Sequence, residues 1–284
     1  YSERLDYRRF LDGSIGEILI YNRALNEIER NAVGLYLAQK WGVTENSYNQ
    51  SVDVLPSPSA VVLDADTTLV LDGVNQKIAS INTATASALE LGGTLTIAGT
   101  QPSVIAGDVG GYGGLILEPG GTLELAGDCS YRSSTQIGAG STLKLSGYLY
   151  SAGADEIAKI IVEDNATLEL SQWGDTVCDS LGAMSSDASN LLFDNSNLRV
   201  TGTTFGGRGA TFSGDLTLEA ADGANWHIVG ADDNWLFDSG AALLLTGAGN
   251  GYFSKKFNAS GGITKTGSGR WTLGGTNSFN GPLT

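Results

Sequence analysis

Three pairs of acidic residues could take part in sugar chemistry, because glycoside hydrolysis needs two carboxylates placed across the scissile bond. The pairs are Asp64 with Asp66, Glu163 with Asp164, and Asp232 with Asp233. Each pair lies in or next to a predicted turn, where Asp and Asn are favoured because their side chains bond the nearby main chain. Turn formation therefore accounts for the pairs better than catalysis. Calcium binding by the same turns stays open as an alternative, although the sequence has no DxDxDG-type loop.

The chain has a single histidine, His227, in the segment ANWHIV. A catalytic histidine needs an orienting carboxylate and a nucleophile at a spacing that this sequence does not offer. We therefore expect His227 to be a solvated or packed strand residue. The glycine-rich stretch GDVGGYGG at 107–114 lacks the Lys-Ser/Thr of a phosphate-binding loop, and no helix is predicted after it. The sequence thus predicts no catalytic, cofactor-binding or metal-binding residue and a protein that is not an enzyme.

Aromatic and sulfur side chains give weaker signals. Four tryptophans could stack on sugars along an exposed groove: Trp173, Trp226, Trp235 and Trp271. Trp271 occupies a predicted strand position, which favours packing over sugar binding there. Cys129 and Cys178 lack CxxC spacing and a His-rich neighbourhood, so a zinc site is disfavoured. A disulfide between them requires adjoining turns of the fold, and the sequence leaves that question open.

A repeated six-residue phrase defines the elements that must position these residues. Its copies are TLVLDG (68–73), TLTIAG (94–99), TLELAG (122–127), TLKLSG (142–147), TLELSQ (167–172), NLRVTG (197–202), DLTLEA (215–220), ALLLTG (242–247) and RWTLGG (270–275). The copies start 18 to 30 residues apart and alternate apolar with polar positions, as a strand does. A strand that recurs at this period predicts a solenoid, in which each unit buries its apolar face against its neighbours. Nine coils would give a rod of roughly 40 Å.

Alternation within the phrase predicts two sets of stacked side chains. The leucines, with Ile97 and Val200, should form inward columns from Leu69 to Leu245, so Leu143→Asp should disrupt the fold. The residues between the inward pairs should form an outer ladder of alternating charge: Glu124, Lys144, Glu169 and Arg199. Several coils should also have a second strand just before the phrase, joined to it by a short turn, and a longer loop should then close the coil. These second strands are SALELGG, GLILEPGG, KIIVEDNA, NLLFDNS and NWLFDSGA.

Residues 1–43 differ from the rest of the chain. Ile15–Tyr21 predicts a strand, and a helix over 26–41 follows, with Asn26 as its N-cap and Glu29 completing a capping box. Gly42 is the expected glycine after the helix. One helical face should hold Ile28, Ala32, Leu35, Tyr36 and Gln39. Residues 44–58 predict a linker, and 59–284 the solenoid. The helix and the linker should shield the N-terminal end of the solenoid, because an open β-helix end exposes unpaired strand edges.

Composition limits the partners of this chain. The 284 residues carry a net charge of −15 and include 40 glycines and five prolines. Without a basic stripe to displace counterions from phosphate, nucleic acid is not an expected partner. No apolar run is long enough to span a bilayer. The chain opens and closes within its own patterns and shows no signal peptide, so we expect it to be a piece of a longer polypeptide.

Two resemblances fall on these segments. GSIGEILIYNRALNEIERNAVGLYLAQKWGV at 13–43 resembles the closing segment of laminin-G-like, concanavalin A-type lectin jelly rolls in bacterial surface proteins. GGITKTGSGRWTLGGTNSFNGPLT at 261–284 resembles the passenger-associated transport repeat of autotransporter-type proteins. The residues that match that repeat are Gly262, Lys265, Gly267, Gly269, Leu273, Gly275, Asn277, Phe279, Gly281 and Thr284. Trp271 and Pro282 depart from its pattern.

The resemblances imply an all-β, right-handed parallel β-helix, secreted or displayed on the outer membrane of a diderm bacterium. Its N-terminal strand and helix would be the end of a jelly roll, and no lectin site carries over to this chain. The expected function is a structural display stalk related to adhesion. A glycan- or calcium-binding module on the solenoid is the alternative, and a β-helix polysaccharide lyase or hydrolase is less favoured. The expected partners are the rest of the polypeptide, a second copy end to end, and surface glycans.

Overall fold

The computed structural model describes residues 16–22, 27–42, 55, 59–149, 159–171, 191–206, 209–229, 235–258 and 260–284. The chain divides into two compact units, residues 1–52 and 53–284. The first unit contains the helix, and the second contains the strands.

The predicted helix is confirmed as α1 (Glu27–Lys40). Trp41 N–H donates to the Leu37 carbonyl at 3.0 Å, and Gly42 follows with φ of 65°, a conformation that favours glycine. Ala38 is buried, whereas Tyr36 is 44% exposed, so Tyr36 does not belong to the buried face as predicted. Asn26 lies outside the described residues.

The strand predicted at Ile15–Tyr21 is wrong for residues 16–21, which have no strand assignment. Ile18 and Ile20 are 69% and 91% exposed, because no described segment supplies a paired strand or an apolar layer for them. Side chains hold this segment instead. Glu17 forms an ion pair with Lys40 at 2.9 Å and accepts a hydrogen bond from Trp41 Nε1 at 3.3 Å.

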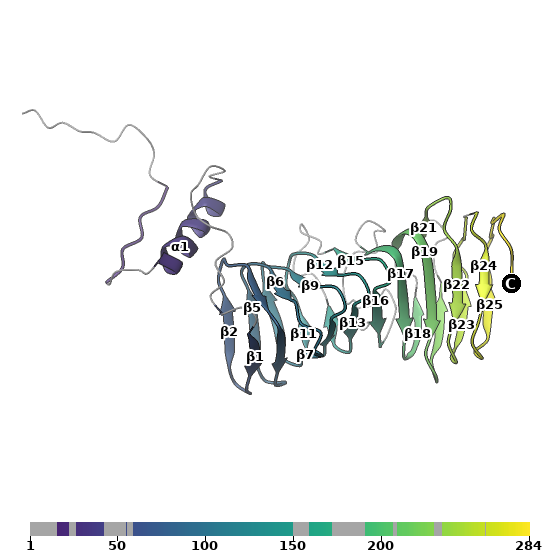
Figure 1. Cartoon of the computed structure of the whole chain (residues 1–284), viewed down its shortest axis with the longest axis horizontal. Coiled ribbons are helices and arrows are strands. Elements are labelled where there is room, and N and C mark those ends of the chain that lie inside the picture. The colour runs from purple at the N-terminus through teal and green to yellow at the C-terminus, as the bar shows by residue number, and fades with distance from the viewer. Residues whose placement is uncertain are drawn as a thin grey trace, which may run out of the picture. The chain divides into compact units, whose positions relative to one another are not determined.

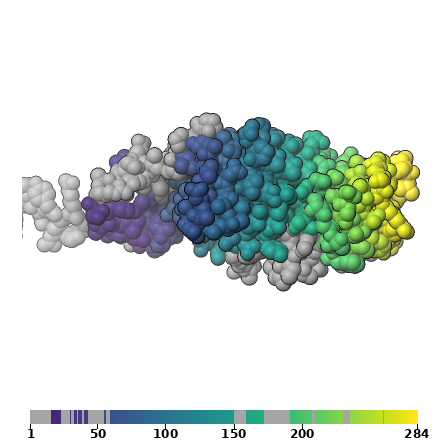
Figure 2. All heavy atoms as spheres, turned by 90° about the horizontal axis from the view of Figure 1, so that it is seen from below, coloured from purple at the N-terminus to yellow at the C-terminus, as the bar shows by residue number. Residues whose placement is uncertain are grey.

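The second unit is a parallel β-helix, as the sequence predicts, and every strand pair described in it is parallel (Figure 1). It has three faces, one more than the sequence predicts. The colour in Figure 2 changes steadily along this unit, because successive coils stack in sequence order. Each complete coil contributes one short strand to each face. Most strands of the third face lie where the sequence predicts only a loop, because short segments such as DC at 128–129 have no visible alternation.

The first face consists of β3 (Gln76–Ile78), β6 (Leu95–Ile97), β9 (Leu115–Leu117), β12 (Thr135–Ile137), β15 (Ile160–Val162), the first halves of β17 (Leu191–Val200) and β19 (Ala210–Ala220), and β21 (Trp235–Phe237). The second face consists of β1 (Ala60–Leu63), β4 (Ser80–Thr83), β7 (Ser103–Ile105), β10 (Thr122–Leu125), β13 (Thr142–Leu145), β16 (Thr167–Leu170), the second halves of β17 and β19, β22 (Leu243–Thr246) and β24 (Ile263–Lys265). In β17 and β19 the two faces join at a corner, where the register shifts between Asp194 and Ser196.

The third face carries two stacks in the described residues. One consists of β2 (Thr68–Leu71), β5 (Ala88–Leu91), β8 (Asp108–Gly111), β11 (Asp128–Cys129) and β14 (Tyr148–Leu149). The other consists of β18 (Thr203–Gly206), β20 (Asn225–Ile228), β23 (Asn250–Phe253) and β25 (Trp271–Leu273). The coil between the two stacks contains residues 172–190, which follow β16 and are not among the described residues.

Six of the nine repeated phrases stack on one another along the second face. They are the copies that start at 122, 142, 167, 197, 215 and 242. The prediction of one continuous column is wrong for the other three: the copies at 68 and 270 lie on the third face and the copy at 94 on the first. The second face begins instead with AVVL, SINT and SVI, which lack the phrase. The phrase suits any of the three faces, because each needs one inward and one outward row.

The inward columns form the core as predicted. Leu123, Leu143, Leu168 and Leu198 are each 0% exposed and pair in register from coil to coil. Leu69, in the first coil, is only partly buried. In the later coils, aromatic rings add a second stack through Phe193, Phe212, Phe237, Phe257 and Phe279, with centroid spacings of 5.2, 4.7, 4.9 and 6.0 Å.

A glutamine side chain covers part of the first coil. The amide of Gln76 accepts from Leu55 N–H at 2.9 Å and donates to the Leu55 carbonyl at 3.1 Å. Gln76 is 1% exposed, and this two-way bond imitates the pairing of another strand. The predicted shielding of this end by the linker is thus confirmed at Leu55, the linker residue that the structure describes. Shielding by the helix stays a prediction.

Candidate functional site

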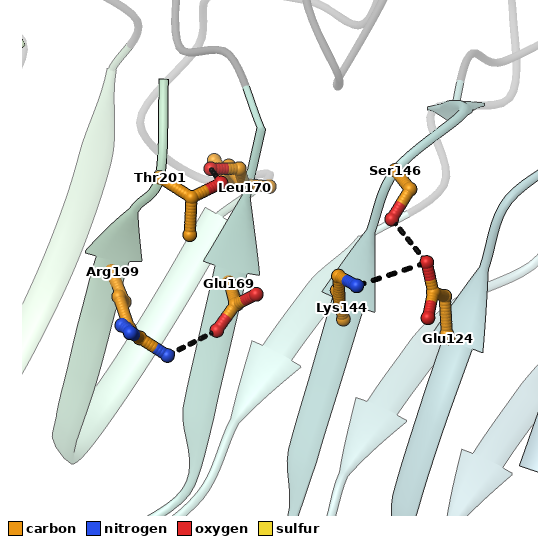
Figure 3. Close-up of polar contacts among 7 residues, drawn as sticks. All are labelled: Glu124, Lys144, Ser146, Glu169, Leu170, Arg199 and Thr201. Atoms are coloured by element: carbon orange, nitrogen blue, oxygen red, sulfur yellow. Dashed lines mark hydrogen bonds and ion pairs between the residues drawn. The ribbon is translucent and has the colours of Figure 1, made fainter. Parts of the chain in front are cut away.

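The predicted outer ladder of alternating charges is present on the β-helix and is the first candidate site (Figure 3). Glu124 pairs with Lys144, Lys144 with Glu169, and Glu169 with Arg199 in adjacent coils of the second face. The ladder continues one coil further than predicted, because Arg199 also pairs with Glu219.

Contacts within the ladder form two groups. Lys144 Nζ lies 3.0 Å from Glu124 Oε1, which also accepts from the Ser146 hydroxyl at 2.5 Å. Arg199 bridges two acids, with Nη1 2.6 Å from Glu169 Oε2 and Nε 3.2 Å from Glu219 Oε1. The Glu169 side chain is only 11% exposed, so its pair is shielded from solvent better than the others. Exposed pairs of this kind contribute under about 1 kcal/mol each, so the ladder selects the register more than it stabilises the fold.

A groove on the third face is a second candidate site, and the sequence did not predict it. It is an open depression of about 290 Å³, and its described lining residues are His227, Asn250, Gly251, Tyr252, Arg270 and Thr272. We call it the third-face groove. Among the described residues, the strands β20, β23 and β25 supply the lining in neighbouring coils, together with Arg270, which directly precedes β25.

Two outward rows of side chains border the third-face groove. In one row, Phe205 pairs with His227 and His227 with Tyr252, and the ring centroids are 4.3 and 5.9 Å apart. The other row is polar. There Asn250 Nδ2 donates to Asn225 Oδ1 at 3.2 Å, and Asn250 Oδ1 accepts from Arg270 N–H at 3.0 Å.

Beneath the third-face groove, the inward residues of the same strands fit together closely. Trp226 is 0% exposed, and its ring centroid lies 6.0 Å from that of Trp271 in an edge-on arrangement. Gly251 pairs with both residues and lies between them. Trp271 Nε1 donates to the Thr246 carbonyl at 3.0 Å, which fixes the indole of Trp271.

The structure separates the predicted candidate residues from one another. Asp64 and Asp66 lie in the turn between β1 and β2, and Glu163 and Asp164 in the turn between β15 and β16, as predicted. The Gln136 amide bonds Glu163 across the coils. Asp232 and Asp233 lie outside the described residues, as does Trp173.

The remaining candidates are structural. His227 is a packed strand residue, stacked on Phe205. Trp226 and Trp235 are 0% and 3% exposed, so neither can stack on a sugar. Half of the stretch at 107–114 is strand β8, which agrees with its rejection as a phosphate-binding loop. Within the described ranges, no group of three or more His, Cys, Asp or Glu side chains is placed to hold a metal ion.

Cys129 is a free, fully buried thiol beneath the third face. Burial, together with the nearby carboxylates of Asp128 and Asp108, raises the pKa of Cys129 to about 12. Burial likewise raises the pKa of Tyr131, whose hydroxyl bonds Thr135 at 2.5 Å. Cys178 lies outside the described residues. Neither Cys129 nor Tyr131 is placed to act as a nucleophile or base at neutral pH.

One signal could have located the third-face groove. The segments NWHI, NGYF and RWT place an outward aromatic or polar residue at equivalent positions, but their spacing becomes informative only once the coils are in register. Where the structure describes the chain, no helix is long and apolar enough to cross a membrane. Comparison of the chain with family models, with curated proteins and with solved structures gave no match.

Proposed function

We propose that this chain is a stalk segment that holds an upstream domain away from the cell in a large, adhesion-related bacterial surface protein. The observation that carries the proposal is the second face, where ten strands stack in parallel. At one strand spacing per coil this face alone extends for roughly 43 Å. Each coil buries one more apolar layer, so such a rod is rigid and can be lengthened without changing its cross-section.

The last coil supports the passenger-type resemblance, because residues of the matching motif have structural roles in it. Gly262, Gly267 and Gly275 have φ of 84°, 72° and 73°, which favours glycine. Asn277 Oδ1 accepts from Phe257 N–H at 3.0 Å, and the Phe279 ring packs on Phe257. Ile263 bridges to Leu283, so the motif spans one full coil.

Further parts of the proposal follow from both resemblances. The protein would be secreted or displayed on the outer membrane of a diderm bacterium, with α1 as the end of a lectin-like jelly roll. Its partners would be the rest of the polypeptide, a second copy end to end and surface glycans. A role as an enzyme is disfavoured, because the acid pairs in described residues lie in separate turns.

Deleting one coil tests the stalk proposal. Thr142 stacks directly on Thr122, so deletion of residues 122–141 removes one coil in register. We expect the variant to fold, to be shorter by about 4.8 Å in small-angle scattering, and to keep its adhesion to host surfaces in cell-binding assays. Deletion of residues 122–131, half a coil, should unfold the neighbouring coils. A full-coil deletion that folds but abolishes adhesion would contradict a spacer role.

A further inference from the structure

We propose that the third-face groove binds a carboxylated saccharide chain. This inference goes beyond the stalk function, since a rod needs no ligand. Its basis is the combination of aromatic side chains, an arginine that forms no ion pair in the described part of the chain, and a lining whose described residues include no acid.

An aromatic row runs through the groove: His227 and Tyr252 line it, and Phe205 extends the row one coil further. Phe205 is 66% exposed, and its ring stacks on His227 with an interplanar angle of 13°. The row stops after Tyr252, because the next position in register is Thr272, which has no ring. The Tyr252 hydroxyl leans toward the next coil, where a Cβ on Gly274 would lie 2.6 Å from it. A sugar ring has an apolar C–H face and a polar rim, and it can pack against such amphipathic aromatic side chains.

Arg270 gives the groove its preference for an anion. The side chain is exposed, and within the described part of the chain its guanidinium forms no ion pair. By contrast, Arg199 is held between Glu169 and Glu219. A free guanidinium presents a planar fork that matches a carboxylate with two parallel hydrogen bonds.

The lining of the groove contrasts with the charge of the whole chain. The sequence has 31 acidic and 16 basic residues, yet none of the six lining residues is acidic. Repulsion of an anionic ligand by distant acids is largely screened, because the Debye length is about 8 Å at physiological ionic strength. A polynucleotide would need many cations along its phosphates, and a single arginine does not supply them. A chain that carries separate carboxylates on sugar rings fits one arginine beside an aromatic row.

The single histidine makes the test specific to this site. We would titrate the full chain with a galacturonate tetramer and follow the ring signals of His227 by NMR, with affinity from calorimetry. The matched probe is the methyl-esterified tetramer, which has the same rings without the charge. We expect the acid form to bind and to shift the His227 signals, and the ester to bind about tenfold more weakly or not at all.

Two variants test the contributions of the arginine and of the aromatic row separately. Arg270→Gln should weaken binding of the acid form about tenfold, and Tyr252→Ala should weaken binding of both forms. Lys159→Gln is the matched control, because it removes an exposed positive charge from a different coil and should change nothing.

The proposal is overturned if the acid tetramer does not bind, if the ester binds equally well, or if binding leaves the His227 signals unmoved. An equal loss in Lys159→Gln would also overturn it, since binding would then be non-specific. None of these results bears on the coil deletion, so the stalk proposal stands or falls separately.

Discussion

At the scale of single residues, the close contact of Trp226, Gly251 and Trp271 shows how strictly one position can be constrained. A Cβ on Gly251 would lie 2.3 Å from the Trp271 ring, well inside van der Waals contact. The Trp271 indole occupies the volume that a side chain at Gly251 would need. Glycine is therefore required here for space, because φ of Gly251 is not in the left-handed region.

We expect Gly251→Ala to lower the free energy of unfolding by about 1–3 kcal/mol, the usual cost of overpacking a core. Urea denaturation followed by tryptophan fluorescence measures it. Gly240→Ala is the matched control, because a Cβ there would meet nothing within 4 Å and its φ is not positive. That variant should be neutral or slightly stabilised. Equal stabilities for the two variants would contradict the packing argument.

The charge ladder leads to a pH dependence. The hydrogen bond from Ser146 and the ion pair with Lys144 hold the pKa of Glu124 below its ordinary value, with Ser146 the larger cause. A carboxyl group whose pKa is lower in the folded state stabilises the fold above its unfolded pKa. That contribution is lost as the pH falls through the folded pKa.

We therefore expect Ser146→Ala to be less stable than wild type at pH 7, by about 0.5–1.5 kcal/mol. The difference should shrink between about pH 5 and about pH 3, as Glu124 becomes protonated in both proteins. Thermal unfolding across this pH range measures it. Ser133→Ala, an exposed serine outside the ladder, should track the wild type throughout. A gap that stays constant with pH would show that Ser146 acts through packing alone.

At the scale of elements, alternation within a strand could be predicted from sequence, but the face that a strand occupies could not. Leu143 and Lys144 point inward and outward as their phrase indicates, because a strand fixes alternate sides locally. The phrase at 94–99 has the same pattern yet lies on the first face, where Leu95 pairs with Leu115. Its face is decided by the lengths of the turns that close each coil, which is a property of the whole coil.

The inward column predicts a large effect at its centre. Leu143 is 0% exposed and lies between Leu123 and Leu168. We expect Leu143→Asp to cost about 4 kcal/mol or more, because it removes a buried side chain and places an unpaired carboxylate in the core. Leu143→Met, which keeps the volume, should cost less than about 1.5 kcal/mol. Circular dichroism melts compare them, and a melt of Leu143→Asp close to wild type would refute the stacked core.

At the scale of the whole β-helix, the third-face groove shows what a sequence alone cannot specify. His227, Tyr252 and Arg270 belong to three different coils, so they meet only when those coils are in register. The charge ladder could be predicted because its residues lie within obvious copies of one phrase. The groove residues lie in segments with little resemblance to one another, and only the pairing of β20, β23 and β25 brings them together.

The two ends of the β-helix differ in how their edges are covered, and this difference predicts self-association. Gln76 bonds Leu55 at one end. At the other, Arg270 C=O and Gly274 N–H bond β23, so the main-chain groups of Trp271 and Leu273 face the open edge. Leu273 and Leu283 are 36% and 65% exposed there. An uncovered edge with apolar side chains is a template for pairing with another chain.

We therefore expect the 284-residue chain to associate through this edge with rising concentration, as measured by sedimentation velocity. Leu273→Lys should suppress the association, because a lysine on an edge strand blocks pairing. Tyr112→Lys is the matched control: it adds the same charge at a residue 70% exposed beside β8, in a middle coil, and should leave association unchanged. Monomeric behaviour of the wild type at every concentration would exclude the edge as an interface. Equal suppression by both variants would attribute the effect to net charge rather than to strand pairing.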